Sequence, residues 1–172
     1  MEQNLQQFKT NITKVTVVGP ESTGKTTLCK QLAAHYNTVW VEEFAREYLQ
    51  AKWNHSNKIC ESQDLMPIAE GQILLENNAA KLANSVLFCD TNAVVTKVFS
   101  ELYYGFCDPI IEQAAENHQY DLFFLTNVDV PWHADDLRDK PHDRQKSFQY
   151  FKQTLTSLNK PFIALSGIEH AE

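Results

Sequence analysis

Five short runs of β-branched, aromatic and aliphatic residues recur along the chain, and most are separated by enough residues for a helix. These runs predict strands at 14–19, 37–41, 85–89, 121–126 and 161–166. The first, third and fourth runs are almost continuously apolar, which is typical of parallel strands covered on both faces.

The segments between these runs show the spacing of amphipathic helices, with apolar residues three or four positions apart. They predict helices at 25–36, 64–83, 108–118 and 143–159. Asp64 is a candidate cap for the second helix, and Asp108 followed by Pro109 is a typical helix start. Strands that alternate with helices indicate a three-layer α/β/α fold with a parallel sheet, in which ligands bind at the carboxyl ends of the strands.

The composition is ordinary for a globular protein and is compatible with a small anionic ligand. The chain has 172 residues, so we expect a single domain spanning 1–172. Hydrophobic residues make up 43% and charged residues 22%, and the net charge is −7. An acidic chain lacks the basic stripe of a nucleic-acid-binding surface, so no nucleic-acid partner is expected.

The cysteines and the N-terminus point to a reducing compartment. Cys29, Cys60, Cys89 and Cys107 are not spaced as metal ligands, which favours free thiols. The first ten residues are polar and resemble no signal peptide, and no stretch has the ~20 apolar residues of a membrane span. We therefore expect a cytoplasmic protein with no membrane partner, while its oligomeric state stays open.

The segment GPESTGKT at residues 19–26 matches the phosphate-binding pattern G-x-x-x-x-G-K-[ST]. A predicted strand precedes it and a predicted helix follows it, as the pattern requires. Backbone N–H groups and the helix N-terminus would surround an anion, so the segment predicts ATP binding. The residues expected to contact ATP are Gly19, Glu21, Ser22, Thr23, Gly24, Lys25, Thr26 and Thr27.

Two residues of this loop have distinct expected roles. Lys25 would reach the β and γ phosphates as a catalytic residue, and the Thr26 hydroxyl would bind Mg²⁺. Without nucleotide, we expect Lys25 to face solvent. The alternative interpretation is an ordinary strand–helix turn in which the lysine is incidental.

Asp90 ends the third predicted strand and is the second candidate ligand for Mg²⁺. A carboxylate at the carboxyl end of a neighbouring parallel strand would face the phosphate loop. The alternative is that Asp90 caps the helix expected in the following segment, TNAVVTKVF, and both roles are compatible.

The segment 131–147 is polar and unusually long for a connection, and it holds two of the three arginines, Arg138 and Arg144. It is interpreted as a lid whose guanidinium groups act catalytically on the β and γ phosphates. A solvated loop with surface charges is the alternative.

The third arginine, Arg46, follows the second predicted strand within VEEFARE. In a mononucleotide-kinase arrangement this strand end faces the phosphoryl acceptor. Glu43 is the candidate base for the acceptor hydroxyl and Arg46 a candidate anchor, with Glu42 and Asp90 as alternative bases. Glu43, Arg46 and Glu47 share one helical face, which also suits a simple surface ion-pair ladder.

At these residues the chain resembles the ribosylnicotinamide kinase domain of NadR-type NAD-biosynthesis proteins. Five segments carry the resemblance: GPESTGKTTLCKQLAAHYNT, EEFAREYL, IAEGQ, FCDTNAVVTKVF and DDLRDKPHDRQKSFQYFKQTL. The resemblance implies a P-loop nucleoside/nucleotide-kinase-like fold with a five-stranded parallel sheet of order 2-3-1-4-5. It also implies phosphorylation of the 5′-hydroxyl of nicotinamide riboside, with ATP and Mg²⁺ as cofactors.

The chain departs from the family pattern at two places. Asp136 and Leu137 stand where the family lid has Asp-Gly, and Glu42 stands where family members carry an aromatic residue. Trp40 lies two residues before Glu42, and further aromatic residues that offer stacking surfaces are Tyr103, Tyr104 and Trp132. The alternative functions are a kinase for another nucleoside or nucleotide and an ATP-binding regulatory module with little transfer activity.

Overall fold

A parallel sheet forms the centre of the protein, whose structure is a computed structural model that describes residues 5–129 and 143–166. Its five strands lie in the order β2-β3-β1-β4-β5, and every pairing is parallel. The strands are β1 (Thr13–Val18), β2 (Trp40–Val41), β3 (Val86–Asp90), β4 (Leu122–Thr126) and β5 (Phe162–Leu165). The predicted strand order 2-3-1-4-5 is confirmed.

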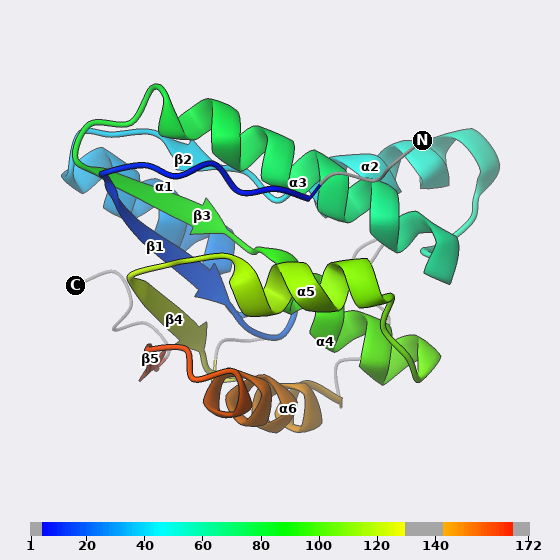
Figure 1. Cartoon of the computed structure of the whole chain (residues 1–172). Coiled ribbons are helices and arrows are strands. Elements are labelled where there is room, and N and C mark those ends of the chain that lie inside the picture. The colour runs from blue at the N-terminus through cyan, green and yellow to red at the C-terminus, as the bar shows by residue number, and fades with distance from the viewer. Residues whose placement is uncertain (1–4, 130–142, 167–172) are drawn as a thin grey trace.

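Helices cover both faces of this sheet, and Figure 1 shows α1 behind β1 and β3 with α5 in front of them. The helices are α1 (Lys25–His35), α2 (Phe44–Ser56), η1 (Ser62–Asp64), α3 (Leu65–Ala80), α4 (Ala93–Tyr104), α5 (Pro109–Asn117) and α6 (Arg144–Ser157). Within the described parts of the chain, no helix combines the length and apolarity that crossing a bilayer would require. The predicted three-layer α/β/α class is confirmed.

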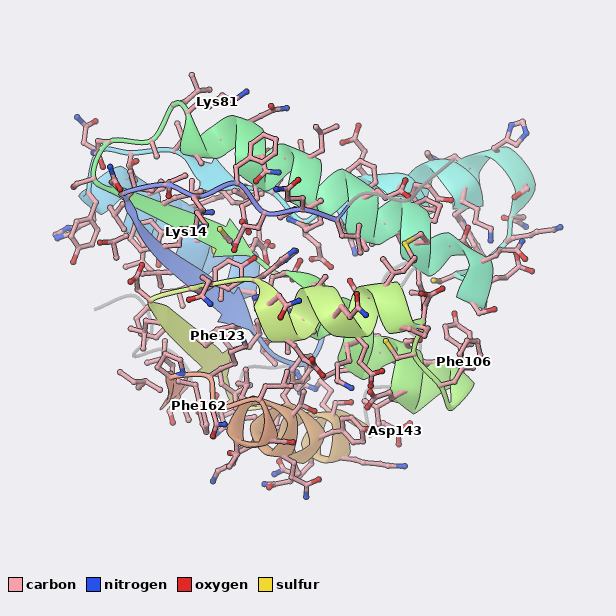
Figure 2. All side chains as sticks on the ribbon, in the orientation of Figure 1. Lys14, Lys81, Phe106, Phe123, Asp143 and Phe162 are labelled. Carbon is pink, nitrogen blue, oxygen red and sulfur yellow. The ribbon has the colours of Figure 1, made fainter. Side chains whose placement is uncertain are left out.

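Alternate residues of each strand point to opposite faces of the sheet, so one apolar strand contributes side chains to two hydrophobic cores. Val15 and Val17 pack with Leu28 of α1, whereas Val18 packs on the other face with α4, α5 and α6. Phe123 of β4 and Phe151 of α6 are fully buried in this second core. Figure 2 labels Lys14 and Phe123 among the crowded side chains of the sheet. Burial on both faces explains why the central strands appear as continuous apolar runs.

Two elements differ from their predicted extent for identifiable reasons. The strand predicted at 37–41 shortens to Trp40–Val41, because residues 37 and 38 complete the end of α1. Asn37 takes a left-handed φ of 52°, and the Thr38 N–H donates to the Ala33 carbonyl of α1 at 2.9 Å. The helix α2 was not among the four predicted helices, since none of its residues, all of them described, is buried.

The two predicted helix caps have different outcomes. Asp108 accepts a hydrogen bond from the Ile110 N–H at 2.8 Å, with Pro109 as the first residue of α5, so this cap is confirmed. The cap predicted for Asp64 is wrong, because its side chain makes no capping bond to α3. Asp64 instead accepts from the Glu61 N–H and pairs with Lys52 at 2.5 Å.

An ion pair is buried at the opposite end of the sheet from the phosphate loop. Lys14 on β1 lies 3.2 Å from Glu76 on α3, and their side chains are only 6% and 3% exposed. Tyr120 donates to the other Glu76 oxygen, and Gln7 donates at 2.8 Å. These bonds compensate the desolvation of both charges, so Glu76 ties the N-terminal segment, β1 and α3 together.

This network yields a stability prediction. Glu76→Gln leaves the Lys14 ammonium buried beside a neutral amide, so the free energy of unfolding should fall by about 3 kcal/mol. Urea denaturation measures the change. Glu112→Gln is the matched control, because Glu112 pairs with Lys97 at 3.3 Å but keeps 46% of its side chain exposed. The control should lose less than about 1 kcal/mol, and equal losses in the two variants would contradict the prediction.

Candidate active site

The phosphate loop joins β1 to α1 through residues with unusual backbone conformations. Gly19, Ser22 and Gly24 have φ values of 146°, 58° and 87°. Gly24 directly precedes α1, and no side chain caps that helix. The first N–H groups of α1 are therefore available to an anion, as a phosphate site at a helix N-terminus needs.

Thr126 at the end of β4 fixes this loop from the neighbouring strand. A Cβ atom added to Gly19 would lie 2.3 Å from the Thr126 hydroxyl, so only glycine permits this approach. The Thr126 hydroxyl lies 2.5 Å from the Thr23 hydroxyl and 3.3 Å from the Val18 carbonyl. Thr23 in turn donates to the Pro20 carbonyl at 2.7 Å. Sequence reasoning missed Thr126, because a threonine at a strand end carries no signal of such a contact.

Lys25 does not face solvent, which corrects the expectation from the sequence. Its side chain folds over the loop, where Nζ donates to the Pro20 carbonyl at 2.8 Å, and the residue is only 8% exposed. This hydrogen bond holds the Lys25 ammonium group against the phosphate loop. A phosphate oxygen would compete with the Pro20 carbonyl for this donor.

Asp90 and Thr26 meet at the edge of the phosphate loop. Asp90 is fully buried, and its Oδ2 accepts a hydrogen bond from the Thr26 hydroxyl at 2.5 Å. Oδ1 has no hydrogen-bond partner within the described ranges. The alternative role for Asp90 as a helix cap is not seen, since α4 is capped by Asn92, which accepts from the Val94 N–H at 2.9 Å.

Burial and, to a smaller extent, the nearby charge of Glu43 raise the pKa of Asp90 to about 6, against the opposing effects of Lys25 and the Thr26 hydrogen bond. A buried carboxylate with an unsatisfied oxygen beside a hydroxyl fits Mg²⁺, which binds through few protein ligands plus phosphate oxygens and water. In the part of the chain that is described, no three His, Cys, Asp or Glu side chains group as a protein-only metal site would require. Thr26 and Asp90 thus suit a metal ion that arrives with a nucleotide.

Glu43 separates two cavities beside this carboxylate. The metal-side cavity, of about 500 Å³, is lined by Thr26, Asp90, Glu43 and Arg46 together with Lys30, Trp40, Glu42 and Glu47. The aromatic cavity, of about 400 Å³, opens on the other side of Glu43 between α2, α3 and α4. Glu43, Arg46 and Glu47 thus lie at one cavity, as their shared helical face predicted.

The lining of the aromatic cavity is mainly apolar and includes two acidic residues. Its walls include Phe99 and Tyr103, whose ring centroids are 5.8 Å apart, and Tyr104, whose hydroxyl donates to the Cys60 carbonyl at 3.0 Å. Glu21 of the phosphate loop and Glu43 are the charged residues on the described lining. Trp40 and Glu42 line the metal-side cavity instead, so the departure from the family pattern at Glu42 lies outside the aromatic cavity.

The three arginines have different positions relative to the loop. Arg144 begins α6, and its Nη1 donates to the Ser22 carbonyl at 3.0 Å, so it lies against the phosphate loop. Arg46 is exposed at the metal-side cavity. Arg138, Trp132 and most of the predicted lid at 131–147 lie outside the described residues.

A third hollow, of about 1260 Å³, lies at the amino ends of the strands and is lined by the N-terminal segment and α5. None of its described lining residues belongs to the phosphate loop or to the two carboxylate-bearing strand ends. The candidate site residues of the described chain lie at the two smaller cavities, near the carboxyl ends of β1, β2 and β3.

The fold and the phosphate loop define a P-loop nucleotide-binding domain. Residues 14–171 match the model of a protein family described as AAA domain, and the chain therefore belongs to this family. Within it the chain is of the NadR type. It is 33% identical over 151 residues to the trifunctional NAD biosynthesis/regulator protein NadR of Escherichia coli (strain K12), with 87% of this chain and 37% of that protein covered. The NadR of Salmonella typhimurium (strain LT2) is also 33% identical, with 91% of this chain and 38% of the relative covered. The chain thus spans less than half of the length of these relatives.

Solved structures give the same class of fold. A NadR protein in complex with NR superposes with a TM-score of 0.74 at 25% identity, covering 90% of this chain and 46% of that one. A deoxyadenosine kinase from M. mycoides gives 0.65 at 11% identity, covering 88% and 89%. A thymidylate kinase from Ehrlichia chaffeensis gives 0.66 at 14% identity, covering 94% of each chain. The predicted P-loop fold of the nucleoside and nucleotide kinase type is therefore confirmed.

The raised pKa of Asp90 gives a pH-dependent prediction. A carboxyl group whose pKa is higher in the folded state destabilises that state when ionised, and this cost disappears as the pH falls through about 6. Asp90→Asn should therefore be more stable than the wild type at pH 7, by at most about 3 kcal/mol. The difference should shrink towards pH 4. Urea unfolding without Mg²⁺ or nucleotide measures it, and an equal difference at both pH values would contradict the prediction.

Proposed function

We propose that this protein is an ATP-dependent kinase that transfers the γ-phosphoryl group of ATP to the 5′-hydroxyl of nicotinamide riboside. The products are nicotinamide mononucleotide and ADP, so the reaction belongs to NAD salvage. One observation carries the proposal: Glu43 stands between the buried Asp90 beside the phosphate loop and an aromatic cavity. A carboxylate at that junction is suited to accept the proton of a hydroxyl group bound in the cavity.

The donor side of the reaction uses the phosphate loop. Backbone N–H groups of Gly19 and of residues 21–27 bind the phosphates, and Lys25 leaves the Pro20 carbonyl to bind the β and γ phosphates. Arg144, already against the Ser22 carbonyl, and Arg138 neutralise the transferring group. Thr26 and Asp90 hold Mg²⁺, which when bound offsets the phosphate charge.

The acceptor side uses Glu43 and Arg46. Glu43 accepts the proton of the 5′-hydroxyl as its oxygen attacks the γ-phosphorus, and Arg46 anchors the acceptor or the phosphate from the metal-side cavity. Asp90 is less suited as the base, because its Oδ2 accepts the Thr26 hydroxyl and its Oδ1 would be a ligand of the metal ion. Glu42 lies at the metal-side cavity, away from the aromatic walls.

The charge of the aromatic cavity supports a cationic nucleoside as acceptor. Its described lining holds the carboxylates of Glu21 and Glu43 and no basic side chain. Nicotinamide riboside has a positively charged pyridinium ring, which favours both aromatic faces and carboxylates. A nucleoside monophosphate would instead bring its own negative charges against the same two carboxylates. A NadR protein of similar fold has been solved in complex with NR, which supports the same ligand class.

We propose one kinase domain over 1–172 whose partner is a small-molecule acceptor, with no nucleic-acid or membrane partner. Four free cysteines and a net charge of −7 support a cytoplasmic location.

An acceptor panel tests the substrate. With ATP and Mg²⁺, turnover measured by coupled ADP release should be highest with nicotinamide riboside. Adenosine, cytidine, thymidine and thymidine monophosphate should each have a kcat/KM lower by about 10-fold or more, which corresponds to about 1.4 kcal/mol of lost charge complementarity. Release of ADP at one rate with and without every acceptor would indicate a nucleotide-binding module and sink the kinase proposal.

The base is tested by Glu43→Gln, which keeps the shape of the side chain and removes its proton affinity. We expect kcat with nicotinamide riboside to fall by about 100-fold or more. ATP affinity measured by calorimetry should stay within about 2-fold, since Glu43 is not part of the phosphate loop. Glu116→Gln on the exposed side of α5 is the control and should retain wild-type kcat. A Glu43→Gln variant with unchanged kcat would exclude Glu43 as the base.

A further inference from the structure

A buried amide on α3 holds the backbone on both sides of Glu43. Gln72 is only 6% exposed. Its Nε2 donates to the Glu42 carbonyl at 3.0 Å, and its Oε1 accepts from the Phe44 N–H at 2.9 Å. The two peptide groups that flank Glu43 are therefore bound by one side chain, in the manner of a backbone partner in a sheet.

The same amide reaches the neighbouring strand end. The Thr91 hydroxyl donates to the Gln72 Oε1 at 3.4 Å, and Thr91 directly follows Asp90. The Thr91 N–H is itself bound to the Val17 carbonyl at 3.0 Å, and its φ is 73°. Gln72 thus connects the turn that carries Glu43 to the end of the strand that carries Asp90.

Gly71 brings α3 close enough for these bonds. A Cβ atom at this position would lie 2.1 Å from the ring of Phe44, the first residue of α2. The Phe44 ring therefore rests directly on the α3 backbone at Gly71. Gly71 and Gln72 are adjacent residues of α3, and both support the turn at Glu43. Gly71 does so by packing against Phe44, and Gln72 by its hydrogen bonds.

The turn at Glu43 needs such support, because its own elements supply little. Strand β2 contributes two residues to the sheet, and no residue of α2 is buried. The Glu43 side chain does not cap α2 either. A carboxylate on such a turn would sample many positions, whereas a base must stay within hydrogen-bond reach of its hydroxyl.

We propose that Gln72 is a positioning residue that sets where Glu43 stands relative to Asp90 and the acceptor. The role rests on the proposed kinase function, but the hydrogen bonds that define it do not. Loss of the amide should lower kcat and leave ATP affinity unchanged, because Gln72 touches the acceptor-side turn and not the phosphate loop.

Asn77, one turn further along α3, provides a matched control. It is also 6% exposed. Its Nδ2 donates to the Gln6 carbonyl at 2.9 Å, and its Oδ1 accepts from the Phe8 N–H at 3.0 Å. Asn77 therefore makes the same pair of bonds to the two peptide groups that flank Gln7, far from the active-site carboxylates.

The experiment compares two near-isosteric variants of the full chain, Gln72→Met and Asn77→Leu. Amide hydrogen exchange by NMR should show loss of protection at Phe44 alone in the first and at Phe8 alone in the second. With nicotinamide riboside, Gln72→Met should lower kcat by about 10- to 100-fold. Its KM for ATP should stay within about 2-fold, and Asn77→Leu should keep the wild-type kcat. Where Gln72→Met does not fold, Gln72→Asn replaces it, since the shorter amide cannot span both peptide groups.

The two readouts separate the inference from the function on which it rests. Unchanged protection of Phe44 overturns the inference, as does a kcat for Gln72→Met equal to that of Asn77→Leu. If the wild type turns over no acceptor, the proposed function fails. Selective loss of protection at Phe44 then still supports Gln72 as the group that holds the Glu43 turn.

Discussion

The hydrogen bond between Thr26 and Asp90 is the contact on which the active site depends. It joins the first turn of α1 to the end of β3 at 2.5 Å, and it does so around a fully buried carboxylate. Burying that carboxylate is unfavourable, as its raised pKa shows. A fold maintains such a group when a cation completes its environment, which is what the Mg²⁺ of a magnesium nucleotide would bring.

The second organising feature is the separation of charge around Glu43. The metal-side cavity is lined by both basic and acidic side chains. The charged side chains on the described lining of the aromatic cavity are carboxylates only, those of Glu21 and Glu43. Glu43 lines both cavities and therefore lies at the boundary between these two charge environments. The two cavities thus differ in their electrostatics although they share one side chain.

Much of this arrangement could be predicted from the sequence, because it follows from strong local patterns. The apolar runs located the sheet, and the phosphate pattern located the loop, since both depend on residue type at fixed spacing. Helix α2 escaped prediction because its inner side lines cavities and buries no residue. Lys25 and Thr126 were misjudged or missed for another reason. Their roles depend on contacts with Pro20 and Thr23 that only the folded chain creates.

The brevity of β2 also affects how the molecule meets other copies of itself. Because β2 is an outer strand of the sheet and contributes only Trp40 and Val41, that edge offers few unpaired backbone groups to a passing chain. A longer edge strand would hold the turn at Glu43 more firmly, but its unpaired backbone groups could also pair with a strand of another molecule. The short strand thereby favours colloidal stability at this edge of the sheet.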